Sequence, residues 1–221
     1  MLILLAIIWV GCVALLFVGP QEPSYGSKKL SELLYDRPGM GNRILQRRLA
    51  GDNFFELFDE SADAVRAIGR KALPTLLGML EANDSKVRRK LMELASEQTV
   101  IKTHFHVAWE KHESAIQGFA ALGTNALSAV PELIQLSRHS DAGVRETALV
   151  CLDCVGPAKD TLLPVLEAGL RDSDHSVKTV SAEILAKRFP ENALKLDIYE
   201  LYPQFKPEPE SEDEKVSSSA K

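Results

Sequence analysis

The chain has little cysteine, few aromatic residues and none of the short motifs that mark common catalytic sites. Of its 221 residues only three are cysteines (Cys12, Cys151 and Cys154), which provide no disulfide framework and leave the redox compartment open. Gly-rich phosphate loops and the H-E-x-x-H zinc motif are absent. With 45% apolar and 6% aromatic residues, the composition fits a compact helical domain, and a net charge of −5 argues against nucleic acid as a partner.

Long apolar runs are also scarce, with one exception at the start of the sequence. Residues 1–18 carry no charged side chain, and Gly19-Pro20 ends the run. The exit Leu16-Phe17-Val18 lacks the small-residue cleavage pattern of a secretory signal, so we expect residues 1–20 to be an uncleaved transmembrane or signal-anchor helix. A cleaved signal peptide is the alternative. Lys28 and Lys29 follow closely, which favours a cytoplasmic body by the positive-inside rule, but a basic stretch upstream would reverse this, so the side of the membrane stays open.

The other end of the chain is polar and acidic. Residues 204–221 consist mostly of proline, glutamate, serine, aspartate and lysine, which bury too little apolar surface to offset the entropy of ordering. We expect a disordered acidic tail there, with an acidic interaction tail as the alternative. Between the two ends, we expect a linker with N-terminal capping helices at residues 21–60 and a repeat domain at residues 61–203.

The repeat domain is predicted from a unit that recurs three times. In each copy a glycine precedes a proline, which is followed at ten, thirteen and fourteen residues by an acid, a valine and a basic residue. The positions are Gly69, Pro74, Asp84, Val87 and Arg88; Gly123, Pro131, Asp141, Val144 and Arg145; and Gly156, Pro164, Asp174, Val177 and Lys178. Repeats of this size indicate an α-solenoid, which offers a long binding surface and needs no catalytic pocket.

Each unit contains two amphipathic helical patterns. We expect Pro74, Pro131 and Pro164 in the first turn of a helix, where the missing N–H would have no partner in the helix. The three acids are expected to cap the helix that begins just before the buried valine. From Val144, the next helix carries Cys151 inward, and Gly156 is expected to end it.

An insertion separates the first two copies. Pro74 and Pro131 lie much further apart in the sequence than Pro131 and Pro164 do, so residues have been added between the first and second units. The extra segment is expected near residues 96–112, where β-branched and aromatic residues interrupt the helical pattern. Insertions of this kind often emerge on the binding face of a solenoid.

The three units resemble HEAT repeats, from about Ser61 to Phe189. With the apolar start, the stretch Glu22-Pro23-Ser24-Tyr25-Gly26 and the stretch Ala72-Leu73-Pro74, the chain is similar to a group of bacterial membrane-anchored HEAT-repeat proteins, most of them uncharacterised. HEAT units often carry an Asp eight residues after the proline that forms a ladder between repeats. Asp172 fits this pattern, whereas Ala82 and His139 depart from it.

The resemblance implies where a partner would bind. In HEAT solenoids the second helix of each unit lines the concave side, with outward positions one, four and seven residues after the proline. These are Thr75, Gly78, Glu81, Glu132, Gln135, Arg138, Val165, Ala168 and Arg171. Their mixed chemistry predicts a protein or peptide partner. The leading hypothesis is a non-catalytic, membrane-tethered interaction scaffold, with no cofactor, no metal and no small-molecule substrate.

An enzymatic alternative rests on histidines and cysteines. His104, His106 and His112 cluster in the insertion and are residue types that bind zinc or iron, but their spacing matches no established motif. Deoxyhypusine hydroxylases, which are HEAT-like, bind two irons through several His-Glu dipeptides, and only His112-Glu113 occurs here. A resemblance to phycobilin lyases of the HEAT type is neither supported nor excluded. Cys151 and Cys154 form one C-x-x-C inside a helical pattern and are interpreted as core and core-edge residues.

A lipid-surface alternative rests on basic clusters. These are Lys86, Arg88, Arg89 and Lys90, and Arg43, Arg47 and Arg48. Such clusters can meet the phosphates of anionic lipid headgroups, although runs of this kind are usually solvated helix faces.

Overall fold

The computed structural model describes residues 22–35, 60–82 and 107–207. Most of these residues are helical, which confirms the predicted helical class. A small antiparallel hairpin, which the sequence analysis did not predict, precedes the helices. The chain divides into two compact units between Gly156 and Pro157.

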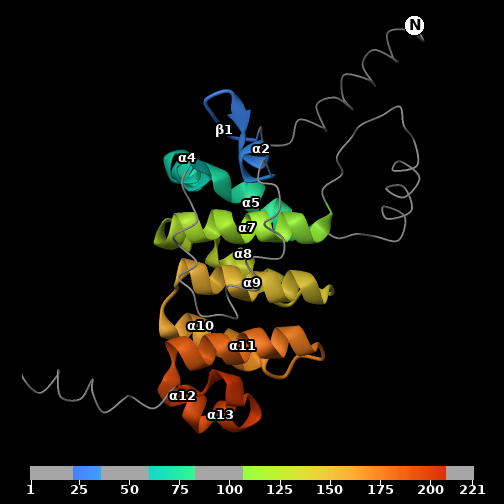
Figure 1. The fold of residues 1–221 in the computed structure, drawn as a ribbon, viewed down its shortest axis with the longest axis vertical. Coiled ribbons are helices and arrows are strands. Elements are labelled where there is room, and N and C mark those ends of the chain that lie inside the picture. Colours follow the sequence, from blue (N-terminus) through green and yellow to red (C-terminus); the bar gives the residue numbers. More distant parts are fainter. Residues whose placement is uncertain (1–21, 36–59, 83–106, 208–221) are drawn as a thin grey trace, which may run out of the picture. The chain divides into compact units, whose positions relative to one another are not determined.

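Unit 1 holds the hairpin and the first helices (Figure 1). Its elements in chain order are β1 (Ser24–Tyr25), β2 (Lys28–Lys29), α2 (Leu30–Tyr35), α4 (Glu60–Ile68), the 3-10 helix η2 (Gly69–Ala72), α5 (Leu73–Leu80), α7 (Ala108–Leu122), the 3-10 helix η3 (Gly123–Ala129), α8 (Val130–Leu136) and α9 (Ala142–Val155). The hairpin pairs Ser24 with Lys29 and Tyr25 with Lys28.

Helix α7 organises the core of unit 1. It packs against α2, α4, α5 and α9, while α8 packs against α9. Phe119 on α7 is fully buried, as are Leu76 on α5 and Leu133 on α8. A Cβ added to Gly118 would lie 2.3 Å from Cδ2 of Leu76, so α7 approaches α5 this closely only because residue 118 has no side chain.

In unit 1 the prolines and the glycine of the repeat mark helix ends as predicted. Pro74 and Pro131 lie in the first turns of α5 and α8, which confirms the prediction for both. Gly156 ends α9 in the left-handed conformation with φ of 69°, a region that a glycine enters without a steric cost. The first copy's Asp84, Val87 and Arg88 lie outside the described residues.

Unit 2 continues the pattern from Pro157. It contains α10 (Lys159–Gly169), α11 (His175–Arg188), α12 (Pro190–Lys195), α13 (Ile198–Leu201) and the 3-10 helix η4 (Pro203–Phe205). Helices α10 and α11 pack together, and α12, α13 and η4 contact α11. Tyr202 and Phe205 stack with ring centroids 6.0 Å apart, so residues 204 and 205, the start of the predicted tail, are structured.

The prediction for Pro164 is wrong. Helix α10 begins at Lys159, so Pro164 lies inside the helix rather than in its first turn. The segment before the proline is a 3-10 helix in the first two copies but is continuous α-helix in the third. One intrahelical hydrogen bond is therefore missing at Pro164, because proline has no N–H.

The predicted anchor lies outside the described residues, and the predicted insertion lies partly within them. None of the helices in residues 22–35, 60–82 and 107–207 combines the length and apolar character needed to cross a membrane. Residues 1–20 lie outside these ranges. Of the predicted insertion at 96–112, residues 108–112 form the first turns of α7, so its end is helical and belongs to the core layer.

Candidate functional site

The outward residues of α5 and α8 form the candidate site in unit 1. The two helices contact each other, and each buries the residues two and five positions after its proline, namely Leu76 and Met79, and Leu133 and Leu136. The residues between them face away from this core. We call the set Thr75, Gly78, Glu81, Glu132, Gln135 and Arg138 the α5/α8 face.

Exposure follows this alternation along both helices. Glu81, Glu132, Gln135 and Arg138 are exposed, as is Gly78, and Thr75 is half-buried. The face therefore presents two carboxylates, one amide and one guanidinium around a position without a side chain. Such a surface offers hydrogen-bond donors and acceptors of both signs, which suits a polypeptide better than a uniformly charged polymer.

The corresponding residues of α10 do not all face outward. Ala168 and Arg171 are exposed, but Val165 is buried at 8% exposure, so the prediction that it faces outward to meet a partner is wrong. The apolar side chain of Val165 is buried, as is that of its neighbour Leu166 on α10. The residue at the same repeat position on α8 is the charged Glu132. Because α10 belongs to unit 2, the α5/α8 face consists of residues of unit 1 alone.

The acids of the second and third copies are helix caps, as predicted. Oδ1 of Asp141 accepts from the amides of Gly143 at 2.8 Å and Val144 at 3.4 Å. Oδ1 of Asp174 accepts from Ser176 and Val177 at the same two distances. These carboxylates satisfy amides that have no partner within the helix, so their role is structural.

The turns before these caps use two different acceptors for the same amide. In unit 2, Oδ1 of Asp172 accepts from the backbone N–H of Asp174 at 2.8 Å. In unit 1, Nδ1 of His139 accepts from the N–H of Asp141 at 3.1 Å. The departure of His139 from the Asp pattern therefore leaves the local hydrogen bond of the turn intact, which the sequence analysis did not foresee.

Basic side chains on α7 and α9 form hydrogen bonds to backbone carbonyls just beyond the end of the preceding helix. Nη1 of Arg145 on α9 donates to the carbonyls of His139 at 2.9 Å and Ser140 at 3.1 Å, just beyond α8. Nε2 of His112 on α7 lies 2.8 Å from the carbonyl of Ala82, just beyond α5. His112 precedes Arg145 by one repeat length, so His112 stands on α7 where Arg145 stands on α9, whereas the sequence analysis placed the basic residue of the first copy at Arg88. This spacing was the signal that could have identified its role from the sequence.

The His112 position does not form a metal centre with the residues around it. Within the described ranges, no three His, Cys, Asp or Glu side chains are grouped to hold a metal ion. The neighbouring Glu113 is half-buried. The pKa of its carboxyl is raised, mainly by desolvation and to a smaller extent by repulsion from Glu110. His104 and His106 lie outside the described residues, as do the basic clusters at 43–48 and 86–90.

The cysteine pair is placed as the sequence analysis predicted. Cys151 is fully buried in α9, and Cys154 is half-buried one turn later. The two thiols are not joined in a disulfide. Cys151 therefore acts as a small core residue that allows close packing around α9.

Comparisons of the chain with protein-family models, curated proteins and solved structures give no match, so its function is inferred from the residues described above.

Proposed function

We propose that the chain is a membrane-tethered, HEAT-like α-solenoid that binds a protein or peptide partner through the α5/α8 face. The tether is residues 1–20, and the body is built from helical pairs and carries out no reaction of its own. Three helix pairs support the solenoid interpretation, since α5 packs with α7, α8 with α9 and α10 with α11. In the pairs α8–α9 and α10–α11 the acid of the repeat caps the second helix. In α5 and α8 the proline of the repeat lies in the first turn.

The exposed polar face of two neighbouring helices is the observation that carries this proposal. Glu132 and Gln135 lie one turn apart on α8, Arg138 follows just beyond the end of α8, and Glu81 is the residue that ends α5. These side chains contribute little to the core, because the buried positions of both helices are occupied by leucine, valine and methionine. Long polar side chains in a row across adjacent helices provide the alternating contacts that an extended or helical peptide requires.

The histidine-based enzyme is the less favoured function. His112 is held by a backbone carbonyl and fastens α7 to the end of α5. A nitrogen used in this way is not available to ligate a metal without releasing the helix junction. No reaction is therefore assigned to this residue.

Partner capture with a matched control tests the proposal. The tagged full chain is purified from its native membranes beside the triple variant Glu132→Ala, Gln135→Ala, Arg138→Ala. The control triple Glu191→Ala, Lys195→Ala, Gln204→Ala removes one acid, one base and one amide from exposed positions of unit 2. We expect a stoichiometric partner to be lost only in the first variant.

A photo-crosslinker makes the assignment direct. Placed at Gln135, it should attach to that partner, whereas at Gln204 it should not. Retention of the partner in the α8 triple variant, or equal crosslinking at both positions, would contradict the proposed face. Absence of any protein crosslinked at Gln135 in native membranes would contradict the scaffold function itself.

A further inference from the structure

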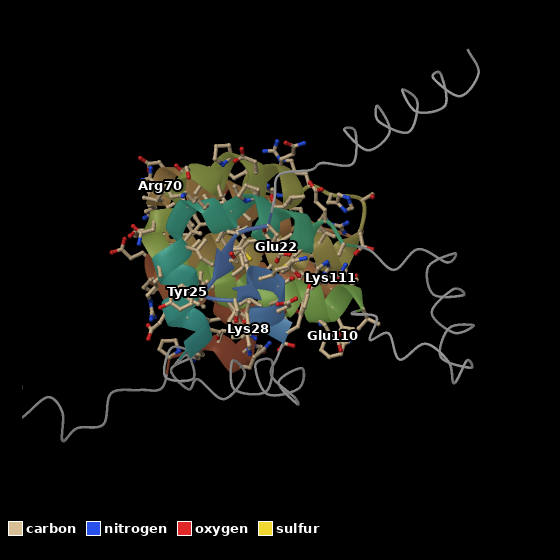
Figure 2. The ribbon with its side chains drawn as sticks, turned by 90° about the horizontal axis from the view of Figure 1, so that it is seen from above. Glu22, Tyr25, Lys28, Arg70, Glu110 and Lys111 are labelled. Carbon is tan, nitrogen blue, oxygen red and sulfur yellow. The ribbon has the colours of Figure 1, made fainter. Side chains whose placement is uncertain are left out.

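The hairpin of unit 1 presents an exposed aromatic and two exposed lysines. All residues from Ser24 to Lys29 are exposed, with Tyr25 at 50%, and Gly26 makes the turn with φ of 61°. The register places Tyr25 opposite Lys28. Figure 2 looks down on this end of unit 1 and shows Tyr25 and Lys28 on the hairpin, and Glu110 and Lys111 on α7, which packs against α2.

The acids near the lysines are directed at the start of α2. Glu22 accepts from both the amide and the hydroxyl of Ser31, with Ser31 Oγ at 3.0 Å from Oε2. Oε2 of Glu32 accepts from the backbone N–H of Lys29 at 3.0 Å. Both carboxylates therefore satisfy amides at a helix N-terminus, where negative charge is favourable. Lys28 and Lys29 are exposed residues of the hairpin.

The chain between the apolar run and the hairpin is short. Val18 is the last residue of the run and Glu22 is the first described residue, so four residue steps separate them. Fully extended, four steps reach at most about 14 Å. The headgroup region of one leaflet is roughly 5–8 Å thick, so a hairpin attached to a membrane-inserted run stays close to the lipid surface.

From these observations we infer that the Ser24–Lys29 hairpin lies against the membrane and binds anionic lipid headgroups through Lys28 and Lys29, with Tyr25 in the interfacial layer. The inference rests on the proposed tether and adds the surface by which the body meets the bilayer. Tyrosine is enriched at membrane interfaces because its ring is apolar and its hydroxyl is polar. Lysines near an anionic surface gain from its negative potential.

The overall charge of the chain sharpens this assignment. A net charge of −5 means that an anionic bilayer repels the chain as a whole, so contact is favourable only where cations gather. Arg70 and Lys71, in the 3-10 helix after α4, are further exposed cations of unit 1. Asp63 on α4 is paired with Arg66 at 2.8 Å and so opposes these cations less.

Fluorescence quenching in vesicles tests the inference with the full chain. A fluorophore is attached at Ser27→Cys, at the tip of the hairpin, in a background with Cys12→Ser and Cys154→Ser. The control label is at Ser140→Cys, an exposed position in the turn between α8 and α9. Vesicles of phosphatidylcholine, with and without phosphatidylglycerol, carry a nitroxide quencher on the lipid headgroup.

We expect strong quenching at residue 27 and weak quenching at residue 140, increased by phosphatidylglycerol and reduced by salt. Each lysine near an anionic surface shifts the ratio of contacting to detached hairpins about fivefold. The variant Lys28→Glu, Lys29→Glu should therefore lose most of the phosphatidylglycerol-dependent quenching. The control Lys187→Glu, Lys195→Glu, which makes the same charge change on unit 2, should retain it.

Carbonate extraction of the same vesicles tests the membrane tether separately from the contact of the hairpin with lipid. If the chain resists extraction but residue 27 is quenched no more than residue 140, the hairpin inference is wrong and the tether stands. If the chain is extracted as a peripheral protein, the tether is wrong and the inference is overturned with it. Equal loss of quenching in both charge-reversal variants would also contradict specific contact by Lys28 and Lys29.

Discussion

The helix pairs α8–α9 and α10–α11 follow the same repeat spacing but close their turns with different chemistry. In both pairs an aspartate caps the second helix with the same pair of hydrogen-bond distances. The amide of that aspartate is accepted by His139 in one turn and by Asp172 in the other. Both turns thus place a side-chain acceptor at this position, although the residue type differs.

The two pairs differ more at their other ends. Gly156 ends α9 in the left-handed region, whereas its counterpart Phe189 ends α11 with φ of −134° and leads directly into Pro190 of α12. The Phe189 ring lies beneath Lys159 and Arg188, whose charged groups are 5.7 and 5.9 Å from its centroid. The repeat therefore specifies the turn between its helices, while the exit from the second helix depends on the segment that comes after it.

The largest expected effect comes from the matching core leucines. Leu152 on α9 and Leu185 on α11 occupy the same position of the repeat and are both fully buried. Leu152→Ala and Leu185→Ala should each lower the free energy of unfolding by about 2–5 kcal/mol, because each leaves a cavity. Urea unfolding of the full chain in mild detergent, followed by circular dichroism, measures this. Leu127→Ala, at an exposed position of η3, is the control, and a loss as large there would contradict the assignment of the core.

The capping residues Asp141 and Asp174 should contribute equally to the free energy of unfolding. Asp141→Ala and Asp174→Ala should each cost about 1 kcal/mol, because two amides at a helix N-terminus lose their acceptor. The same urea series measures the effect. Asp→Asn at either position keeps an acceptor oxygen and should cost much less. A large difference between the two alanine variants would show that the matching distances do not reflect matching energies.

Exchanging the turn acceptors tests whether they are interchangeable. His139→Asp should leave stability within about 0.5 kcal/mol of the parent, whereas His139→Ala should lower it by roughly 0.5–1.5 kcal/mol by leaving the Asp141 amide without this acceptor. Urea unfolding of the three proteins at neutral pH makes the comparison. If the aspartate variant is as unstable as the alanine variant, His139 acts through packing rather than through Nδ1.

A smaller difference concerns charge on the helices that follow the turns. Counted by the repeat spacing, α7 carries Glu113 where α11 carries Thr179, whose hydroxyl donates to the carbonyl of His175 at 2.9 Å. Because the pKa of Glu113 is raised above its ordinary value of 4.5, the folded state holds this proton to a higher pH than the unfolded state does. Stability from this group is therefore present below its ordinary pKa and lost as pH rises through the raised pKa.

Glu113→Gln removes this dependence. The variant should gain stability relative to the parent at neutral pH, with a smaller gain or none at pH values below the ordinary pKa. Urea midpoints measured across that range provide the test. An equal gain at both ends of the range would assign the effect to packing of the amide and not to ionisation.

Much of the local structure was predictable because it depends on few neighbours. Asp141 and Asp174 were expected as caps, Pro74 and Pro131 in first turns, and Gly156 at a helix end, since each follows from the steric and hydrogen-bonding properties of one short segment. The helical class followed from apolar periodicity for the same reason. The α8 residues of the candidate site are likewise exposed, as expected.

What the sequence by itself determined is the helical class, the capped turns of the second and third copies and the alternation of buried and exposed positions on α5 and α8. Only the tertiary structure decided that Val165 is buried, that Pro164 lies inside its helix, that residues 108–112 belong to α7 and that His112 reaches the end of α5. The first group depends on interactions within a few residues along the chain. The second depends on which surfaces meet: the repeat gives Glu132 and Val165 the same position, but packing leaves one exposed and buries the other.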